Sequence, residues 1–289
     1  MSPVEPRIVR FEGFEGIHLV ADVWGDGWPV LLMHGGGQTR YAWGSTARVL
    51  AENGWKAVSL DLRGHGESEW AMNGDYSFTA FGADCIAVTD QLGKPPVLEG
   101  ASLGGISSIL AEGASDRVVS SALVLVDITH RTNPRGVERI KEFMRSGLAG
   151  FATLEEAAEA IAAYAPHRPK RVNPAGLMKV LRLRRDGRWY WHWDPKFFDV
   201  RRTEVPAADY QPLLEFALSN IRVPTLLVTG KLSDVVTEEG VQDFLAKVPT
   251  AKKVDISGAA HMVAGDQNDA FSSAVVDFLE HEIRPALPA

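Results

Sequence analysis

The sequence predicts an α/β protein with one mainly parallel sheet, interrupted by a segment of different character. Short apolar runs alternate with helix-like patterns in the first part of the chain and again in the last. These runs are nearly unbroken, which is typical of strands covered by helices on both faces. The alternation stops between residues 129 and 220. A chain of 289 residues is long enough for one large α/β domain with such an insertion.

Each expected strand is a short apolar run bounded by small or polar residues. These strands cover residues 17–24, 29–35, 55–62, 96–102, 121–128, 223–230 and 252–258. Each expected helix repeats apolar residues at helical spacing. These helices cover residues 45–54, 78–93, 103–114, 238–248 and 268–281, and Ser45 and Gly54 are suited to begin and end the first of them.

The segment between the two runs of alternation is expected to form a helical cap. Residues 154–165 have a helical pattern, and aromatic residues crowd the stretch 188–198. A loop of that length without structure is rare in a compact domain. We therefore predict a core domain from residues 1–128 and 221–289, with a cap formed by residues 129–220.

Composition limits the class of partner. The net charge of −7 argues against nucleic-acid binding, which favours a basic face. The single cysteine, Cys85, allows no internal disulfide and is expected to be a buried apolar residue. The chain start lacks the apolar segment of a signal peptide, and no apolar run approaches the ~20 residues of a membrane span. We expect a cytoplasmic protein that acts on a small molecule, without membrane or nucleic-acid partners, and a homo-oligomer remains open.

Gly100, Ser102 and Gly104 form a G-x-S-x-G pattern between an expected strand and an expected helix. This setting is typical of a nucleophilic serine on a sharp turn, where bulky neighbours would clash. The following helix directs its free N–H groups and positive dipole end at the serine. The alternative is that Ser102 only caps the helix. We predict that it is the nucleophile.

A serine nucleophile needs a base, and the base needs an acid to orient it. His261 lies in a glycine-flanked loop near the C-terminus and is the expected base. Asp234 follows the strand 223–230 and is the expected acid, because the order serine, aspartate, histidine is that of one large fold. Asp127, which ends the strand after the nucleophile strand, is the alternative acid.

Glycines at the end of the strand 29–35 could stabilise the negatively charged oxygen that forms when the serine attacks a carbonyl. Gly36 lies in the run His34–Gly37, where a bare backbone could aim an N–H at a substrate oxygen. The N–H of Leu103, directly after the nucleophile, is the second expected donor. The alternative is that the glycines form only a tight turn. None of the histidines pairs with a second histidine or a cysteine at metal-ligand spacing, so we expect no metal and no cofactor.

Five segments together resemble the α/β-hydrolase superfamily, in the lidded branch that contains esterases, perhydrolases, carbon–carbon hydrolases and epoxide hydrolases. They are LLMHGGGQTRYAW, SLDLRGHGES, EGASLGG, LLVTGKLSDVV and GAAHMVAGDQNDAF, spread from Val30 to Phe271. The resemblance implies an α/β-hydrolase fold with an eight-stranded, mostly parallel sheet and a helical cap inserted after the sixth strand. It also implies a site of Ser102, Asp234 and His261, with Gly36 and Leu103 as oxyanion donors.

Two departures from the family pattern matter. Epoxide hydrolases and dehalogenases carry aspartate at the elbow where this chain has Ser102, and a serine ether would not release product as their ester does. This speaks against cleavage of epoxides or carbon–halogen bonds. The acid loop also has one more residue between Gly230 and Asp234 than is usual in the family, which keeps Asp127 as a candidate.

Aromatic residues of the cap could line an apolar pocket above Ser102, or could instead anchor the cap to the core. The expected pocket residues are Trp43, Trp189, Trp191 and Trp193. The sequence thus predicts a serine hydrolase of a medium-sized, partly hydrophobic ester or lactone. The alternatives are a carbon–carbon hydrolase of a vinylogous diketone, a cofactor-free perhydrolase, or a ligand-binding receptor that keeps the fold without turnover.

Overall fold

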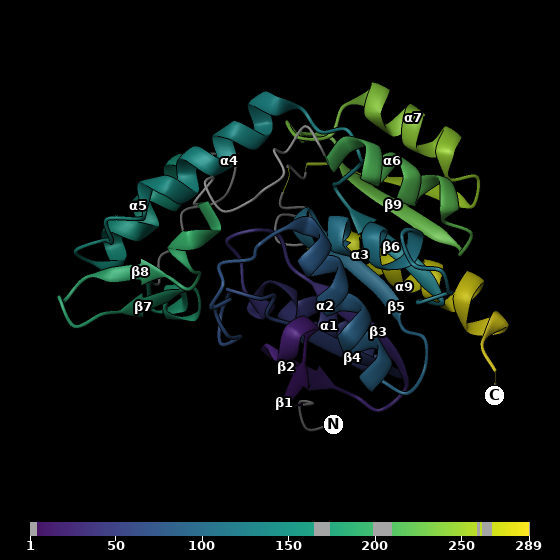
Figure 1. Ribbon diagram of the computed structural model, residues 1–289, viewed down its shortest axis with the longest axis horizontal. Coiled ribbons are helices and arrows are strands. Elements are labelled where there is room, and N and C mark those ends of the chain that lie inside the picture. The colour runs from purple at the N-terminus through teal and green to yellow at the C-terminus, as the bar shows by residue number, and fades with distance from the viewer. Residues whose placement is uncertain (1–4, 165–173, 199–209, 259–260, 262–267, 289) are drawn as a thin grey trace.

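An eight-stranded sheet organises the core of the protein, which is described here from a computed structural model covering residues 5–164, 174–198, 210–258, 261 and 268–288 (Figure 1). In spatial order the strands are β1 (Arg7–Glu12), β2 (His18–Trp24), β4 (Trp55–Leu60), β3 (Trp28–Met33), β5 (Val97–Ala101), β6 (Ala122–Val126), β9 (Thr225–Gly230) and β10 (Ala251–Ile256). Only the pairs β1–β2 and β2–β4 of this sheet are antiparallel. The prediction of a mostly parallel, eight-stranded sheet is confirmed.

Helices cover both faces of the sheet, and alternate strand residues point into two separate apolar layers. One layer contains Leu31 and Met33 of β3 and packs against α2 (Phe78–Gln91), α3 (Leu103–Gly113), α6 (Tyr210–Asn220) and α7 (Glu238–Lys247). The other contains Val30 and Leu32 of the same strand and packs against α1 (Gly44–Glu52) and α9 (Asn268–Phe278). The central strands are therefore apolar on both faces, which explains their unbroken apolar runs.

The two edge strands depart from that pattern, and in β10 only Ile256 is buried. Most residues of β1 are exposed, and Phe11 is its one buried residue. With so little burial, β1 carries no apolar run, and for this reason residue patterns do not single it out.

The segment between β6 and β9 contains helices and a short hairpin (Figure 1). Its described elements are α4 (Pro134–Ser146), α5 (Leu154–Tyr164), a 3₁₀ helix (Pro174–Lys179), the antiparallel strands β7 (Leu181–Leu183) and β8 (Trp189–Trp191), a second 3₁₀ helix (Pro195–Phe198) and α6. All but α6 surround a small apolar cluster of their own. A Cβ on Gly113 of α3 would lie 2.0 Å from the carbonyl oxygen of Ala217, so α6 packs tightly on the core.

Within the described part of the chain, no helix has the length and apolar character needed to span a membrane.

Candidate active site

Ser102 occupies a strained turn between β5 and α3. Its φ of 48° and ψ of −111° lie in a region that side chains rarely adopt, and strain of this kind gathers at functional sites. Although Ser102 is the N-cap residue of α3, its side chain makes no capping hydrogen bond. The hydroxyl is thus not used to begin the helix, which speaks against the alternative that Ser102 is only a cap.

Glycines around Ser102 let three backbone segments approach one another. A Cβ on Gly100 would lie 2.3 Å from the carbonyl oxygen of Gly104, and one on Gly104 would lie 2.2 Å from that of Met33. On Gly105 it would lie 2.3 Å from Cγ2 of Ile128. Any side chain at these positions would push α3 away from the sheet, so the sharp turn depends on them.

The carboxylate that contacts His261 belongs to Asp127. Oδ2 of Asp127 lies 2.8 Å from Nδ1 of His261. The aspartate is fully buried, and its φ is 48°, so the backbone is strained here as it is at Ser102. Two further donors fix it: Gly230 N–H reaches Oδ1 at 3.1 Å, and the Ser233 hydroxyl reaches Oδ2 at 2.5 Å.

These residues meet at one edge of the sheet. The strands β5 and β6 are parallel neighbours, and the N–H of Ser102 donates to the carbonyl oxygen of Val126 at 3.3 Å. Asp127 is the next residue, and it holds His261. Ser102 and Asp127 therefore lie at the carboxyl ends of adjacent parallel strands, where sheets of this type place their sites, and His261 contacts the second of them.

Asp234, expected to be the acid, has another partner. Its Oδ2 forms an ion pair with the guanidinium of Arg139 on α4 at 2.9 Å, and both side chains are partly exposed. A Cβ on Gly136 would lie 2.2 Å from the carbonyl oxygen of Asp234, so the backbone of Asp234 packs closely against α4. In the turn after β9, Ser233 points to the site and its neighbour points to the cap. In the structure the carboxylate that contacts His261 is thus that of Asp127, the alternative acid, and not that of Asp234.

The loop of residues 34–37, called here the glycine loop, has one backbone N–H without an acceptor among the described residues. Gly35 N–H donates to Oε1 of Gln38 at 2.9 Å, and Gly37 N–H donates to Nε2 of His65 at 3.1 Å. Between them, the N–H of Gly36 has no acceptor among the described residues. Leu103 is the first residue of α3, so its N–H has no acceptor within the helix. A Cβ on Gly36 would lie 4.0 Å from Cδ2 of Leu103, so these two residues are close to each other.

Two buried histidines hold this loop in place. Nδ1 of His34 faces the carbonyl oxygen of Gly35 at 2.8 Å, and its Nε2 accepts the N–H of Leu62 at 3.1 Å. His65 repeats this pattern between Arg63 and Gly37. Burial lowers the pKa of His34 to about 4 and that of His65 to about 3. Both rings are neutral near pH 7 and act as fixed supports.

The tryptophans expected to line a pocket lie elsewhere. Trp43 is buried on the α1 and α9 face of the sheet, where its ring lies 6.0 Å from that of Phe271. Trp191 lies inside the cap cluster, and Trp189 pairs by backbone bonds with Phe151. Trp193 forms a backbone bridge to His65. These positions favour anchoring over pocket lining, and the Trp43 side chain is enclosed within the core.

The cap reaches the glycine loop through two side chains that residue patterns did not single out. A Cβ on Gly36 would lie 3.8 Å from the ring of Phe197, and one on Gly37 would lie 2.8 Å from Cε of Met144. Phe197 also packs edge-on against His65. Its place in the aromatic stretch 188–198 was the available signal, but the stretch does not show which ring turns toward the core.

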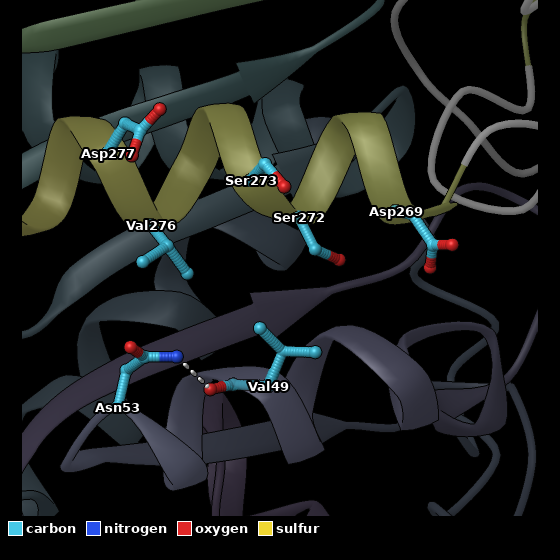
Figure 2. Close-up of a pocket in the computed structure, with 7 residues that line it drawn as sticks. All are labelled: Val49, Asn53, Asp269, Ser272, Ser273, Val276 and Asp277. Carbon is cyan, nitrogen blue, oxygen red and sulfur yellow. Dashed lines mark hydrogen bonds between the residues drawn. The ribbon is translucent and has the colours of Figure 1, made fainter.

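A groove of about 380 Å³ lies elsewhere, between α1 and α9 (Figure 2). Val49 and Asn53 line it from α1, and Asp269, Ser272 and Asp277 are among the residues that line it from α9. It includes none of the residues of the candidate site. Across the described residues, no group of three or more histidines, cysteines or carboxylates could hold a metal ion.

Residues 30–274 match the alpha/beta hydrolase family. The chain belongs to this family. An esterase of Mycobacterium tuberculosis is 29% identical to this hydrolase over 266 residues, which are 89% of this chain and 85% of the relative. A non-heme chloroperoxidase of Kitasatospora aureofaciens is 26% identical over 277 residues, or 92% and 97% of the two chains.

Solved structures agree on the fold of this alpha/beta hydrolase. The structure of the mycobacterial esterase has a TM-score of 0.74 at 26% identity and covers 96% of this chain and 92% of its own. An alpha/beta hydrolase from Novosphingobium aromaticivorans has a TM-score of 0.79 at 24% identity, with 96% and 99% covered. The predicted fold and family are confirmed.

Proposed function

We propose that this alpha/beta hydrolase cleaves carboxylic esters or lactones through an acyl-enzyme on Ser102. The observation that carries the proposal is the strained, uncapped serine at the end of β5, next to the strand β6 whose end carries the Asp127–His261 pair. The esterase among its relatives supports the same reaction class. We assign Ser102 as nucleophile, His261 as base and Asp127 as acid.

In the first half of the reaction, Oγ of Ser102 attacks the substrate carbonyl carbon. Nδ1 of His261 faces Asp127, so Nε2 is the atom that takes the serine proton. The N–H groups of Gly36 and Leu103 stabilise the oxyanion, a contribution typically worth ~3 kcal/mol for each donor. His261 then gives its proton to the leaving alkoxide, and the C–O bond breaks.

In the second half, water replaces the alcohol. His261 takes a proton from the water while the water oxygen attacks the acyl carbon. The tetrahedral intermediate collapses, the proton returns to Oγ of Ser102, and the acid leaves. With a lactone, the alcohol and the acid are ends of the same product.

The side chains around the glycine loop favour an apolar substrate. Phe197 and Met144 of the cap lie against Gly36 and Gly37, so a group bound beside the oxyanion would meet carbon and sulfur atoms. This supports a small to medium, partly hydrophobic substrate.

Arg182, Arg184 and Arg188 give no support to the carbon–carbon hydrolase alternative, which requires a cation for a terminal carboxylate. Arg182 donates to the carbonyl oxygen of Gly66, and Arg188 to those of Ala149 and Gly150. Arg184 lies over the ring of Tyr190. These guanidinium groups already have partners within the protein.

A chromogenic short-chain ester, used with and without a serine-directed phosphonate, tests the proposal. We expect turnover, loss of turnover after labelling of Ser102, and a fall in kcat of roughly 10⁴-fold or more in Ser102→Ala. Labelling of Ser102 without any turnover would instead favour a receptor. Full activity in Ser102→Ala would remove Ser102 from the mechanism.

A further inference from the structure

We infer that Ser233 is a positioning residue for the acid Asp127, and that position 233 can itself carry the acid. The inference rests on the proposed function, because it concerns the same aspartate–histidine pair. It goes beyond it by giving a role to a residue that does not touch the substrate.

The hydrogen bonds of Ser233 fix the direction of its proton. Oγ accepts the N–H groups of Val235 and Val236, both at 3.2 Å. A hydroxyl has two lone pairs and one proton, so both acceptor sites are filled. The proton must point elsewhere, and Oδ2 of Asp127 lies 2.5 Å away. The turn after β9 therefore delivers one directed donor to the acid.

That donor acts on the oxygen that faces the base. Oδ2 of Asp127 receives both the Ser233 hydroxyl and Nδ1 of His261, while Oδ1 receives Gly230 N–H. A fully buried carboxylate needs such donors to offset the cost of its burial and to hold its orientation. Without the hydroxyl, Asp127 can rotate, and the imidazole loses its fixed orientation toward Ser102.

Position 233 lies one hydrogen bond further from the base than position 127. The two positions lie past the ends of β6 and β9, which are parallel neighbours, and the Ser233 hydroxyl contacts the carboxylate oxygen that faces Nδ1 of His261. A carboxylate at 233 would therefore extend toward Nδ1 of His261. Position 234 does not share this property, since Asp234 is paired with Arg139 on α4.

The first experiment removes and restores the hydroxyl. We expect kcat for a chromogenic ester to fall roughly 10- to 100-fold in Ser233→Ala, with KM within about twofold of wild type. Ser233→Thr keeps the hydroxyl and should recover most of that loss. Thermal unfolding of each variant confirms that it folds. A Ser233→Ala enzyme with kcat within about twofold of wild type overturns the inference.

The second experiment moves the acid. Asp127→Asn alone should lose roughly 10³- to 10⁴-fold in kcat, because the base loses its anionic partner. Adding Ser233→Asp should recover at least about tenfold, because the new carboxylate can accept both the imidazole N–H and the amide of Asn at 127. The matched control is Asp127→Asn with Ser233→Asn, which has the same shape without the charge. If the Asp pair is no faster than this control, position 233 cannot carry the acid and the inference fails.

Phosphonate labelling of Ser102 separates this inference from the proposed function. If wild type is inactive, or Ser102→Ala remains active, the proposed function has failed. If Ser102→Ala is inactive while the Ser233 variants match wild type, the hydrolase assignment stands and only the role of Ser233 is lost.

Discussion

At the scale of single residues, backbone strain marks the site. Among the described residues, Glu15, Ser102 and Asp127 are the non-glycine residues with positive φ. Two of these directly follow the neighbouring strands β5 and β6, and both belong to the proposed triad. Strained conformations persist where the surrounding structure imposes them, and here the glycines beneath Ser102 do so.

This strain predicts a trade between stability and activity at position 102. Glycine adopts φ of 48° without a Cβ penalty, so Ser102→Gly should be more stable than Ser102→Ala by about 1 kcal/mol. Both variants should be inactive. Urea denaturation of the two proteins measures the difference. Equal unfolding midpoints would show that the elbow stores no strain.

At the scale of elements, the conformation of the glycine loop depends on two neutral imidazole rings. Nε2 of His65 accepts the N–H of Gly37, and a protonated ring could not. Burial lowers the pKa of His65 from 6.5 to about 3 and that of His34 from 6.5 to about 4. Below pH 6.5 the unfolded chain binds protons that the folded protein does not. Stability is therefore lost as pH falls, at up to ~1.4 kcal/mol per pH unit for each histidine.

Replacing one of these histidines should reduce that loss. In His65→Gln the amide oxygen can still accept from Gly37, but the side chain does not titrate. We expect the stability of this variant to fall less steeply than that of wild type between pH 6.5 and 4.5. Urea midpoints across this range give the two slopes. Equal slopes would mean that His65 does not contribute to acid sensitivity.

Elements with strong burial could be predicted from the sequence, and elements shaped by contacts could not. The central strands carry unbroken apolar runs because both faces are covered, whereas the exposed strand β1 has no such run. The turn that carries Ser102 could be predicted because its glycines lie next to Ser102 in the sequence. The choice between the two candidate acids could not be predicted, because the direction of the Ser233 and Asp234 side chains depends on the turn after β9 and on the helix α4.

At the scale of the whole molecule, one buried acid lies in the middle of the sheet. Glu99 on β5 is fully buried, pairs in register with Leu32 and Val124, and has no hydrogen-bond partner for either carboxyl oxygen among the described residues. Burial raises the pKa of Glu99 from 4.5 to about 8. Between these values the folded protein holds a proton that the unfolded chain has lost. Its contribution to stability is complete below pH 4.5 and is lost as pH rises toward 8.

Glu99→Gln should remove this loss of folding stability at rising pH. The buried histidines titrate in the same way in both proteins, so the difference between the two slopes reports on Glu99. From pH 6.5 to 8 we expect the stability of wild type to fall relative to that of the glutamine variant by up to ~1.4 kcal/mol per pH unit. Denaturation at pH 6.5 and 8 measures both. Parallel curves would show that Glu99 does not carry the proton.

At the same scale, two hydrogen bonds attach the segment between β6 and β9 to the core. The N–H of Asn133, which precedes α4, donates to the carbonyl oxygen of Val235 at 2.8 Å. The hydroxyl of Tyr76 donates to Asp194 at 2.7 Å. The first bond adjoins the turn that carries Ser233, and the second adjoins the 3₁₀ helix that carries Phe197.

We propose that Asp127, and not Asp234, is the acid that serves His261 and Ser102. The most direct test compares kcat for a chromogenic ester in Asp127→Asn and Asp234→Asn. We predict a loss of roughly 10³- to 10⁴-fold in the first and at most about threefold in the second, because Asp234→Asn removes only a partly exposed ion pair with Arg139. The reverse ranking would contradict this account.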